Sequence, residues 1–152
     1  MRRPWPVLIV VAFALVASGC GSDNKAANDY VDSVNQAQNQ FATKFDQLSA
    51  QITSTSTAAQ DRQTLDGFRQ AIDKVVADFR AVKAPDKVKP LHDKLIAEVS
   101  GYGVEIDKAK GAFADDDPQA IVKAQADLVN AVTKVQAQIN QTIADINKKL
   151  RE

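Results

Sequence analysis

The sequence predicts an all-α fold, an antiparallel four-helix bundle whose helices run up, down, up and down. Beyond the first 25 residues, apolar side chains recur every three or four positions, which is the period of a helix with one buried face. The alternation of apolar and polar residues that marks a half-buried strand is absent. Prolines and short polar runs divide the pattern into four segments, and four helices joined by short loops pack most simply in this way. Two long helical hairpins that dimerise are the alternative.

Length and composition exclude several classes of protein. The chain has 152 residues, which is enough for one domain and too short for two ordinary ones. Its 19 basic and 19 acidic residues balance, so the electrostatic footprint of a nucleic-acid-binding protein is missing. One histidine and one cysteine cannot supply a multi-histidine metal site or an internal disulfide. We therefore expect no metal, no cofactor and no nucleic-acid partner.

Residues 1–19 are predicted to be a cleaved secretory signal peptide. Arg2 and Arg3 precede eleven residues without a polar side chain, Val7 to Ala17. A positive start, an apolar run and small residues before a boundary are the three parts of such a signal. As a helix the run spans about 16 Å, roughly half of a bilayer core. It is therefore too short for a stable membrane span.

The end of this segment carries a recognisable motif. Residues 17–20 read Ala-Ser-Gly-Cys, which resembles the lipobox of bacterial lipoproteins, where small residues precede an obligatory cysteine. The resemblance implies that the Cys20 sulfur carries a diacylglycerol and that the chain is cut before Cys20. Two acyl chains give a stable anchor. We therefore expect the mature protein to be attached by lipid to the cell membrane, on its extracytoplasmic side.

The mature chain is predicted to consist of a lipidated cysteine and tether, residues 20–25, and a bundle domain, residues 26–152. The first helix is expected over Ala26 to Ile52. Its buried row is Tyr30, Val34, Phe41, Phe45, Leu48 and Ile52. After a Ser/Thr loop, Thr57 and Gln60 fit a capping box at the start of the second helix. The apolar row of that helix is spaced as in a coiled coil and comprises Leu65, Phe68, Ile72, Val75, Phe79 and Val82.

Proline marks the start of the last two helices. The third begins between Pro85 and Pro90, since proline is tolerated only in the first turn, and it ends at the aspartates of residues 115–117. Its row is Val88, Leu91, Leu95, Val99, Tyr102, Ile106 and Phe113. The fourth helix starts with Asp117 as N-cap and Pro118 at the first helical position. Its row is Ile121, Leu128, Val132, Val135, Ile139, Ile143, Ile146 and Leu150.

The predicted third helix contains two candidate sites, the Gly101-Tyr102-Gly103 stretch and His92. Gly101, Tyr102 and Gly103 interrupt its middle, and each glycine costs roughly 1 kcal/mol relative to alanine. Either a neighbouring element approaches closely there, or the helices part and leave a gap where an apolar ligand contacts Tyr102. His92 lies beside the apolar row, and we expect it to sit at the boundary with its ring reaching water. A pH-responsive or partner-contact role is the alternative.

No catalytic residues are predicted. The chain lacks a serine-nucleophile elbow and a phosphate-binding glycine loop, and the aspartates of residues 115–117 lack the spacing of a calcium loop. The Ala-, Asp- and Val-rich composition, with Ala84-Pro85 followed by Leu91-His92, resembles small helical lipoproteins of actinobacteria whose role is undefined. We expect a binding or scaffolding module for protein or other components of the cell envelope. A carrier of a small apolar ligand or lipid between the helices is the alternative.

Overall fold

Four long helices make up the part of the chain that the computed structural model describes, which is residues 22–51, 56–112 and 117–152. They are α1 (Ser22–Ser49), α2 (Ala58–Ala81), α3 (Lys89–Ala112) and α4 (Pro118–Arg151). Those residues contain no strand, so the predicted all-helical class and four-helix bundle are confirmed. None of these helices combines the length and the apolar character that crossing a bilayer requires.

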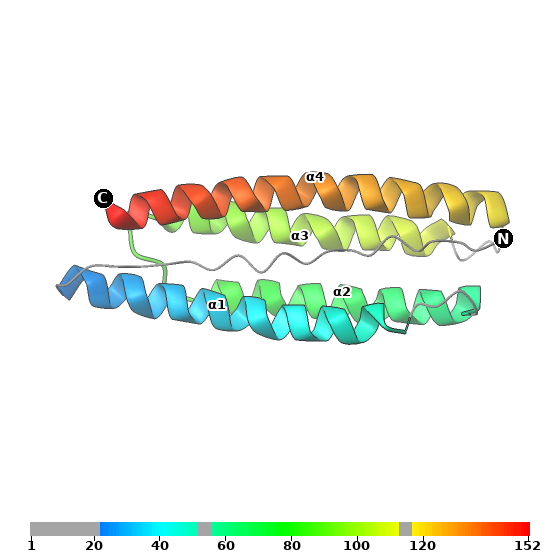
Figure 1. The fold of residues 1–152 in the computed structure, drawn as a ribbon, viewed down its shortest axis with the longest axis horizontal. Coiled ribbons are helices and arrows are strands. Elements are labelled where there is room, and N and C mark those ends of the chain that lie inside the picture. The colour runs from blue at the N-terminus through cyan, green and yellow to red at the C-terminus, as the bar shows by residue number, and fades with distance from the viewer. Residues whose placement is uncertain (1–21, 52–55, 113–116) are drawn as a thin grey trace.

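Each helix packs against the one that follows it in the chain: α1 against α2, α2 against α3 and α3 against α4. At one end of the molecule, the Nζ of Lys87 donates a hydrogen bond of 3.1 Å to the carbonyl oxygen of Leu150. The same end of the molecule holds the start of α1, the end of α2, the start of α3 and the end of α4 (Figure 1). We call this the proximal end and the opposite one the distal end.

The helix α1 begins earlier than its sequence predicts. Residues 22–25, expected to be tether, are its first turn, and the helix ends at Ser49. Nothing in this polar stretch stops a helix, and Lys25 forms an ion pair of 2.7 Å with Asp29 one turn later, which favours the helical state. The helix therefore starts two residues after Cys20.

The predicted starts of α2, α3 and α4 are confirmed, whereas α3 ends at Ala112 and residues 113–116, next to its predicted end, lie outside the described residues. Thr57 and Gln60 form the capping box: the Thr57 hydroxyl oxygen accepts the Gln60 N–H at 3.2 Å, and the Gln60 side chain accepts the Thr57 N–H at 2.8 Å. At the start of α4, the Asp117 carboxylate accepts the Gln119 N–H at 2.9 Å. These bonds satisfy backbone donors that a helix start otherwise leaves unpaired.

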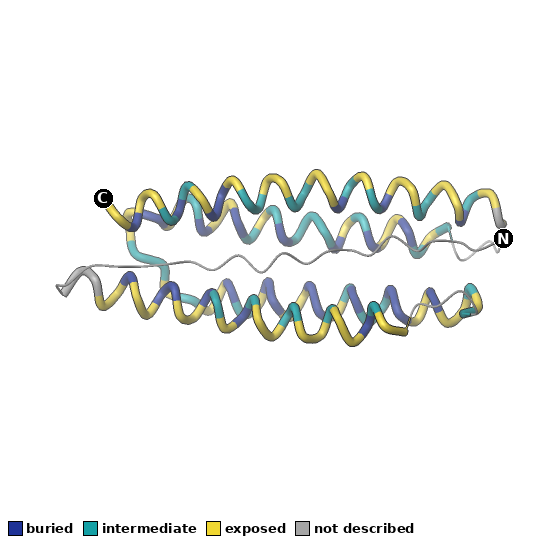
Figure 2. Tube along the Cα trace, in the orientation of Figure 1, coloured by how far each residue is buried: buried dark blue, intermediate teal, exposed yellow. Residues whose placement is uncertain are grey.

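A single apolar cluster fills the space between the helices and draws residues from all four. Figure 2 shows buried residues recurring along each helix with exposed residues between them. The predicted row of α2 is buried except for Val82, which is half-buried. In α1, Phe41 and Phe45 are half-buried and pack against the cluster, whereas Ile52 lies outside the described residues, as does Phe113 after α3.

Candidate functional site

The lipidation site predicted from the sequence, Cys20, lies outside the residues that the structure describes. Its acylation stays a prediction that rests on the lipobox resemblance. The structure contributes the position of the next element, because α1 starts at Ser22 at the proximal end. Any group attached to Cys20 is therefore held close to that end of the bundle.

Gly103 makes room for a side chain from α2. A Cβ at this position would lie 2.8 Å from Nη1 of Arg69, so the guanidinium occupies the space that a larger residue would fill. From there Arg69 forms an ion pair with Asp73 on its own helix. Its Nε also donates to the Asp107 carboxylate on α3 at 2.9 Å. Gly103 thus allows a close contact between α2 and α3.

The neighbouring residues of α3 are packed as well. Gly101 faces α4, where a Cβ would meet Val135 at an ordinary contact distance of 3.9 Å. Tyr102 is partly buried against the apolar core, and burial raises the pKa of its phenol to about 12. It therefore stays neutral at physiological pH. The ligand gap beside these residues stays a prediction, and the two cavities described below lie elsewhere.

His92 does not reach water as the sequence predicts, since only 3% of its surface is exposed. The carbonyl oxygen of Phe79 can only accept, so His92 Nε2 carries the proton and donates to it at 2.9 Å. The other nitrogen, Nδ1, accepts from the Tyr30 hydroxyl at 3.2 Å. These two bonds join α1, α2 and α3. Desolvation by burial lowers the pKa of His92 and keeps the ring neutral.

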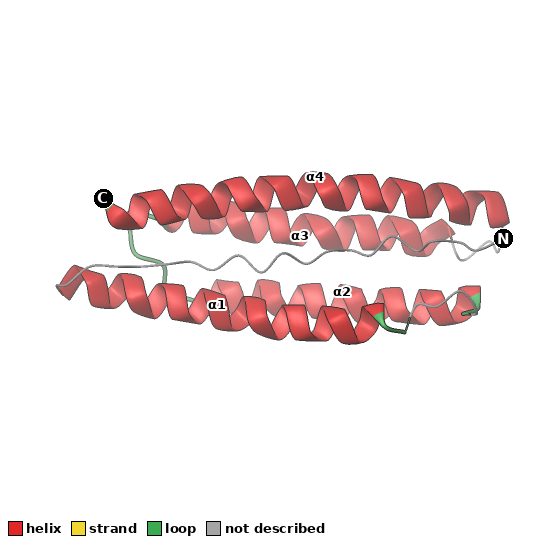
Figure 3. Cartoon of the chain, in the orientation of Figure 1, coloured by secondary structure: helices red, strands yellow, loops and turns green. Residues whose placement is uncertain are grey.

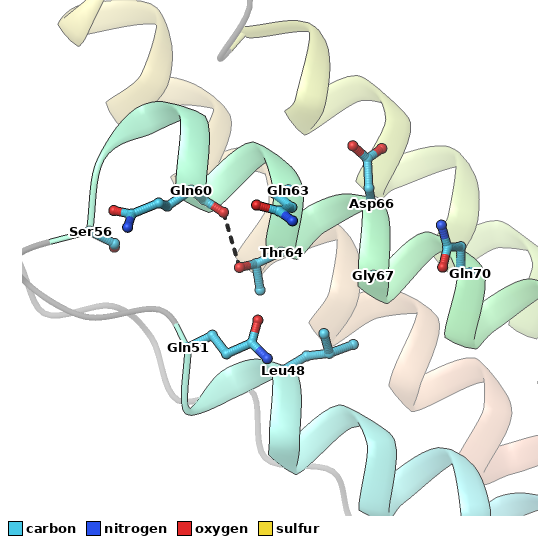
Figure 4. A pocket seen from close by; sticks show the side chains of 9 residues that line it. All are labelled: Leu48, Gln51, Ser56, Gln60, Gln63, Thr64, Asp66, Gly67 and Gln70. Atoms are coloured by element: carbon cyan, nitrogen blue, oxygen red, sulfur yellow. Dashed lines mark hydrogen bonds between the residues drawn. The ribbon is translucent and has the colours of Figure 1, made fainter.

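A groove between α1 and α2 holds two cavities, and the larger lies at the distal end (Figure 4). Its volume is about 760 Å³. Leu48 of α1 and Gln51, two residues after the end of α1, lie on one side of it, and the rest of its lining runs from Ser56, just before α2, along the first half of α2. The lining residues are Leu48, Gln51, Ser56, Gln60, Gln63, Thr64, Asp66, Gly67 and Gln70. Most of them are polar, so this cavity offers hydrogen bonds to whatever enters it.

The smaller cavity continues the groove toward the middle of the helices and has a volume of about 340 Å³. Apolar atoms of Phe41 and Val75, with Ala37 and Ala71, contribute to its lining. Its polar residues are Gln40, Lys44, Gln70, Lys74 and Asp78. Lys74 and Asp78 neutralise each other in an ion pair of 2.7 Å. The two cavities therefore differ in character, one polar and one with more apolar contact surface.

Gly67 lies in the wall of both cavities. A Cβ here would be 2.6 Å from Cδ2 of Leu48, so the glycine lets the Leu48 side chain rest directly on α2. That contact holds the two helices together between the cavities. Gln70 also borders both cavities and is exposed. Its amide can donate and accept hydrogen bonds from either side.

Sequence reasoning did not identify this groove. A signal is present in retrospect, since Gln40, Gln51, Gln60, Gln63 and Gln70 all flank the apolar rows of the first two helices. Whether these glutamines lie close together in space depends on how α1 and α2 are aligned. The spacing of apolar residues within one helix does not determine that alignment.

Within residues 22–51, 56–112 and 117–152, no three histidine, cysteine, aspartate or glutamate side chains are grouped so that they could hold a metal ion. Comparison of the chain with protein-family models, with curated proteins and with solved structures found no match.

Proposed function

We propose that this protein is a lipoprotein anchored through Cys20 to the extracytoplasmic side of the cell membrane. Its antiparallel up-down-up-down bundle serves as a non-catalytic binding module for another component of the envelope. The observation that supports binding is the α1–α2 groove, in which a cavity of about 340 Å³ with apolar contact surface adjoins a polar one of about 760 Å³. Such a surface offers both apolar burial and directed hydrogen bonds.

The shape of the groove favours a chain-like partner. Its lining on α2 extends from Gln60 to Asp78, which corresponds to about 27 Å of helix at 1.5 Å per residue. A groove between two helices that combines an apolar surface with polar residues suits the apolar face of an amphipathic helix. We therefore propose that an amphipathic helical segment of an envelope protein lies lengthwise between α1 and α2.

A carrier of a small apolar ligand is the second candidate. The smaller cavity, where Phe41 and Val75 provide apolar contacts, has a volume within the usual range of ligand pockets. A ligand that binds only the folded state stabilises it by RT ln(1 + [L]/Kd), so the unfolding temperature rises as the ligand concentration exceeds Kd. Thermal shift with fatty acids and phospholipids therefore tests this alternative directly.

The anchor is tested by the substitution Cys20→Ala. We expect the wild-type protein to incorporate labelled fatty acid and to stay in the membrane fraction, and the variant to do neither, because the thioether needs the thiol. Ser18→Ala is the control, since it keeps a small residue before the cysteine. A Cys20→Ala protein that still carries lipid would show that the anchor is assigned to the wrong residue.

The groove is tested by placing a photoreactive amino acid at Gln70, which borders both cavities, and separately at Gln138, an exposed residue of α4. Irradiation of intact cells should give a discrete cross-linked protein from position 70 and at least about tenfold less of it from position 138, because a groove-bound segment contacts only the first position. Equal yields of the same product from both positions would contradict the groove as the binding surface.

A further inference from the structure

The larger cavity of the α1–α2 groove, which we call the distal cavity, is lined mainly by polar side chains. Seven of its nine described lining residues are polar, and four of those seven are glutamines. The other two are Leu48 and Gly67, which meet where this cavity adjoins the smaller one. The distal cavity therefore gathers many hydrogen-bonding groups in one place.

The charges of the distal cavity do not suit an ionic ligand. None of its described lining residues is basic, so nothing in that lining offsets the charge of a phosphate or a carboxylate. Its acidic residue, Asp66, already pairs with Nζ of Lys110 on α3 at 2.5 Å. A second carboxylate, that of buried Asp61, accepts a hydrogen bond of 2.6 Å from the lining residue Ser56. Both carboxylates thus have partners, and the lining suits a ligand without formal charge.

Three of the four glutamines have side chains that make no hydrogen bond in the described part of the chain, and all three are exposed. They are Gln51, Gln63 and Gln70. Each of their amides offers donors and an acceptor in one plane. The fourth, Gln60, accepts the Thr57 N–H at 2.8 Å through its Oε1, which leaves its amide N–H groups to donate. Thr64 donates to the Gln60 carbonyl oxygen at 3.1 Å, and its hydroxyl oxygen can still accept (Figure 4).

A neutral saccharide satisfies such a lining better than the middle of a helix does. The backbone N–H and C=O groups of a helix bond to one another, so a helix can offer these amides only its side chains. A saccharide carries several hydroxyls on every ring, and each hydroxyl both donates and accepts. The volume of about 760 Å³ also lies within the range of about 300–1,000 Å³ that is usual for small-molecule sites.

We propose that the distal cavity binds a neutral saccharide. The glutamine amides bond to its hydroxyls, and Leu48, which rests on Gly67, provides an apolar contact for the C–H groups of a sugar ring. This inference goes beyond the proposed helical partner and does not depend on it. A saccharide here competes with a helical segment for the distal part of the groove. Free sugars and the chains of an envelope glycan present the same hydroxyls, so the experiment compares both.

Binding is measured by NMR titration of the whole protein in dodecylphosphocholine, a detergent without a sugar headgroup. The probes are maltotetraose, mannotetraose and chitotetraose, which are neutral, and tetragalacturonate, which is acidic. We expect at least one neutral tetrasaccharide to bind with a Kd of about 1 mM or lower and to shift backbone signals of residues 60–70. Tetragalacturonate should bind at least about tenfold more weakly, because its carboxylates meet no cation in the described lining.

Two pairs of glutamine substitutions test the residues responsible. Gln63→Ala with Gln70→Ala removes two amides from the distal cavity. Gln36→Ala with Gln138→Ala removes two exposed amides of α1 and α4 that line neither cavity. Since one neutral hydrogen bond contributes about fivefold in affinity, the first pair should weaken binding at least about tenfold, whereas the second should leave it unchanged. Circular dichroism verifies that both variants stay folded.

The monosaccharide of the best probe distinguishes the two sources of the ligand. An affinity equal to that of the tetrasaccharide supports a free sugar, and a much weaker one supports a glycan chain.

Three results would overturn the proposal: no neutral tetrasaccharide with a Kd of about 1 mM or lower, equal affinity in both pairs of variants, or signal shifts confined to α3 and α4. Cross-linking from position 70 in cells tests the helical partner separately. Loss of saccharide binding with a retained cross-link, and the reverse, are therefore distinguishable failures.

Discussion

At the scale of single residues, His92 shows how a polar group can be buried at low cost. Its two ring nitrogens have partners on two other helices, the Tyr30 hydroxyl and the Phe79 carbonyl oxygen. The Tyr30 ring also meets the imidazole edge-on, with centroids 5.4 Å apart. A buried polar atom without a partner costs about 1–3 kcal/mol. The network therefore stabilises one particular alignment of α1, α2 and α3.

Because burial lowers the pKa of His92, the stability of the fold should depend on pH through this residue. The pKa of His92 is lower in the folded protein than its unfolded-state value of about 6.5. The buried neutral ring therefore contributes its full stability at a pH above about 6.5, and this contribution is lost as the pH falls through the folded-state pKa. The unfolding temperature of the wild type should therefore fall more steeply between about pH 7 and about pH 5 than that of His92→Gln. The glutamine amide can still donate to Phe79 but does not titrate in this range.

Thermal melts monitored by circular dichroism provide the measurement. The carboxylates are the same in both proteins, so their titration contributes equally, and the difference between the two slopes reports His92. Parallel pH profiles for the wild type and His92→Gln would mean that His92 is not held neutral in the core.

At the scale of helices, local hydrogen bonds mark where α2 and α4 begin. The capping box of Thr57 and Gln60 starts α2, and Asp117 starts α4. The start of α1 at Ser22 has no such predicted signal, and the helix extends through residues expected to be tether. This extension shortens the connection between the bundle and Cys20, the proposed site of lipidation.

Removal of the α2 cap by Thr57→Ala should destabilise the protein by about 1 kcal/mol, since the Gln60 N–H loses its acceptor. Thr133→Ala is the matched control. Thr133 is exposed in the interior of α4, and its hydroxyl only bonds back to the Val129 carbonyl, an interaction that does little for a helix. Urea denaturation measures both variants. Equal losses of stability would show that the cap contributes nothing specific.

At the scale of the whole molecule, the four helices depend on one shared core. Each carries its apolar residues along one face, so no helix buries that face alone. Ile72 of α2 belongs to this core with 3% of its surface exposed, whereas Val122 of α4 is 50% exposed. The two positions therefore probe the inside and the outside of the same bundle.

Ile72→Asp should cost several kcal/mol, because it buries a carboxylate without a partner. That is a large part of the 5–15 kcal/mol that stabilises a typical domain, so we expect a much lower urea midpoint or an unfolded protein. Val122→Asp should change stability by no more than about 0.5 kcal/mol, as is usual at exposed positions. An unchanged midpoint for Ile72→Asp would mean that α2 does not face the core.

Local sequence was sufficient for the helical class, for most helix boundaries and for the apolar rows. These features depend on residues three or four positions apart, as in the row of α2 and the caps at Thr57 and Asp117. Interactions over that range can be recognised within one segment. The lipobox prediction at Cys20 is equally local.

The partners of His92 and the α1–α2 groove became apparent only from the packed helices. Tyr30 and His92 are 62 residues apart, and Lys87 and Leu150 are 63 apart. Leu48 and Gly67 likewise meet from different helices. Which side chains meet in this way depends on how one helix is rotated and shifted along another. That alignment is set by the packing of the whole core, and no single segment of the sequence contains it.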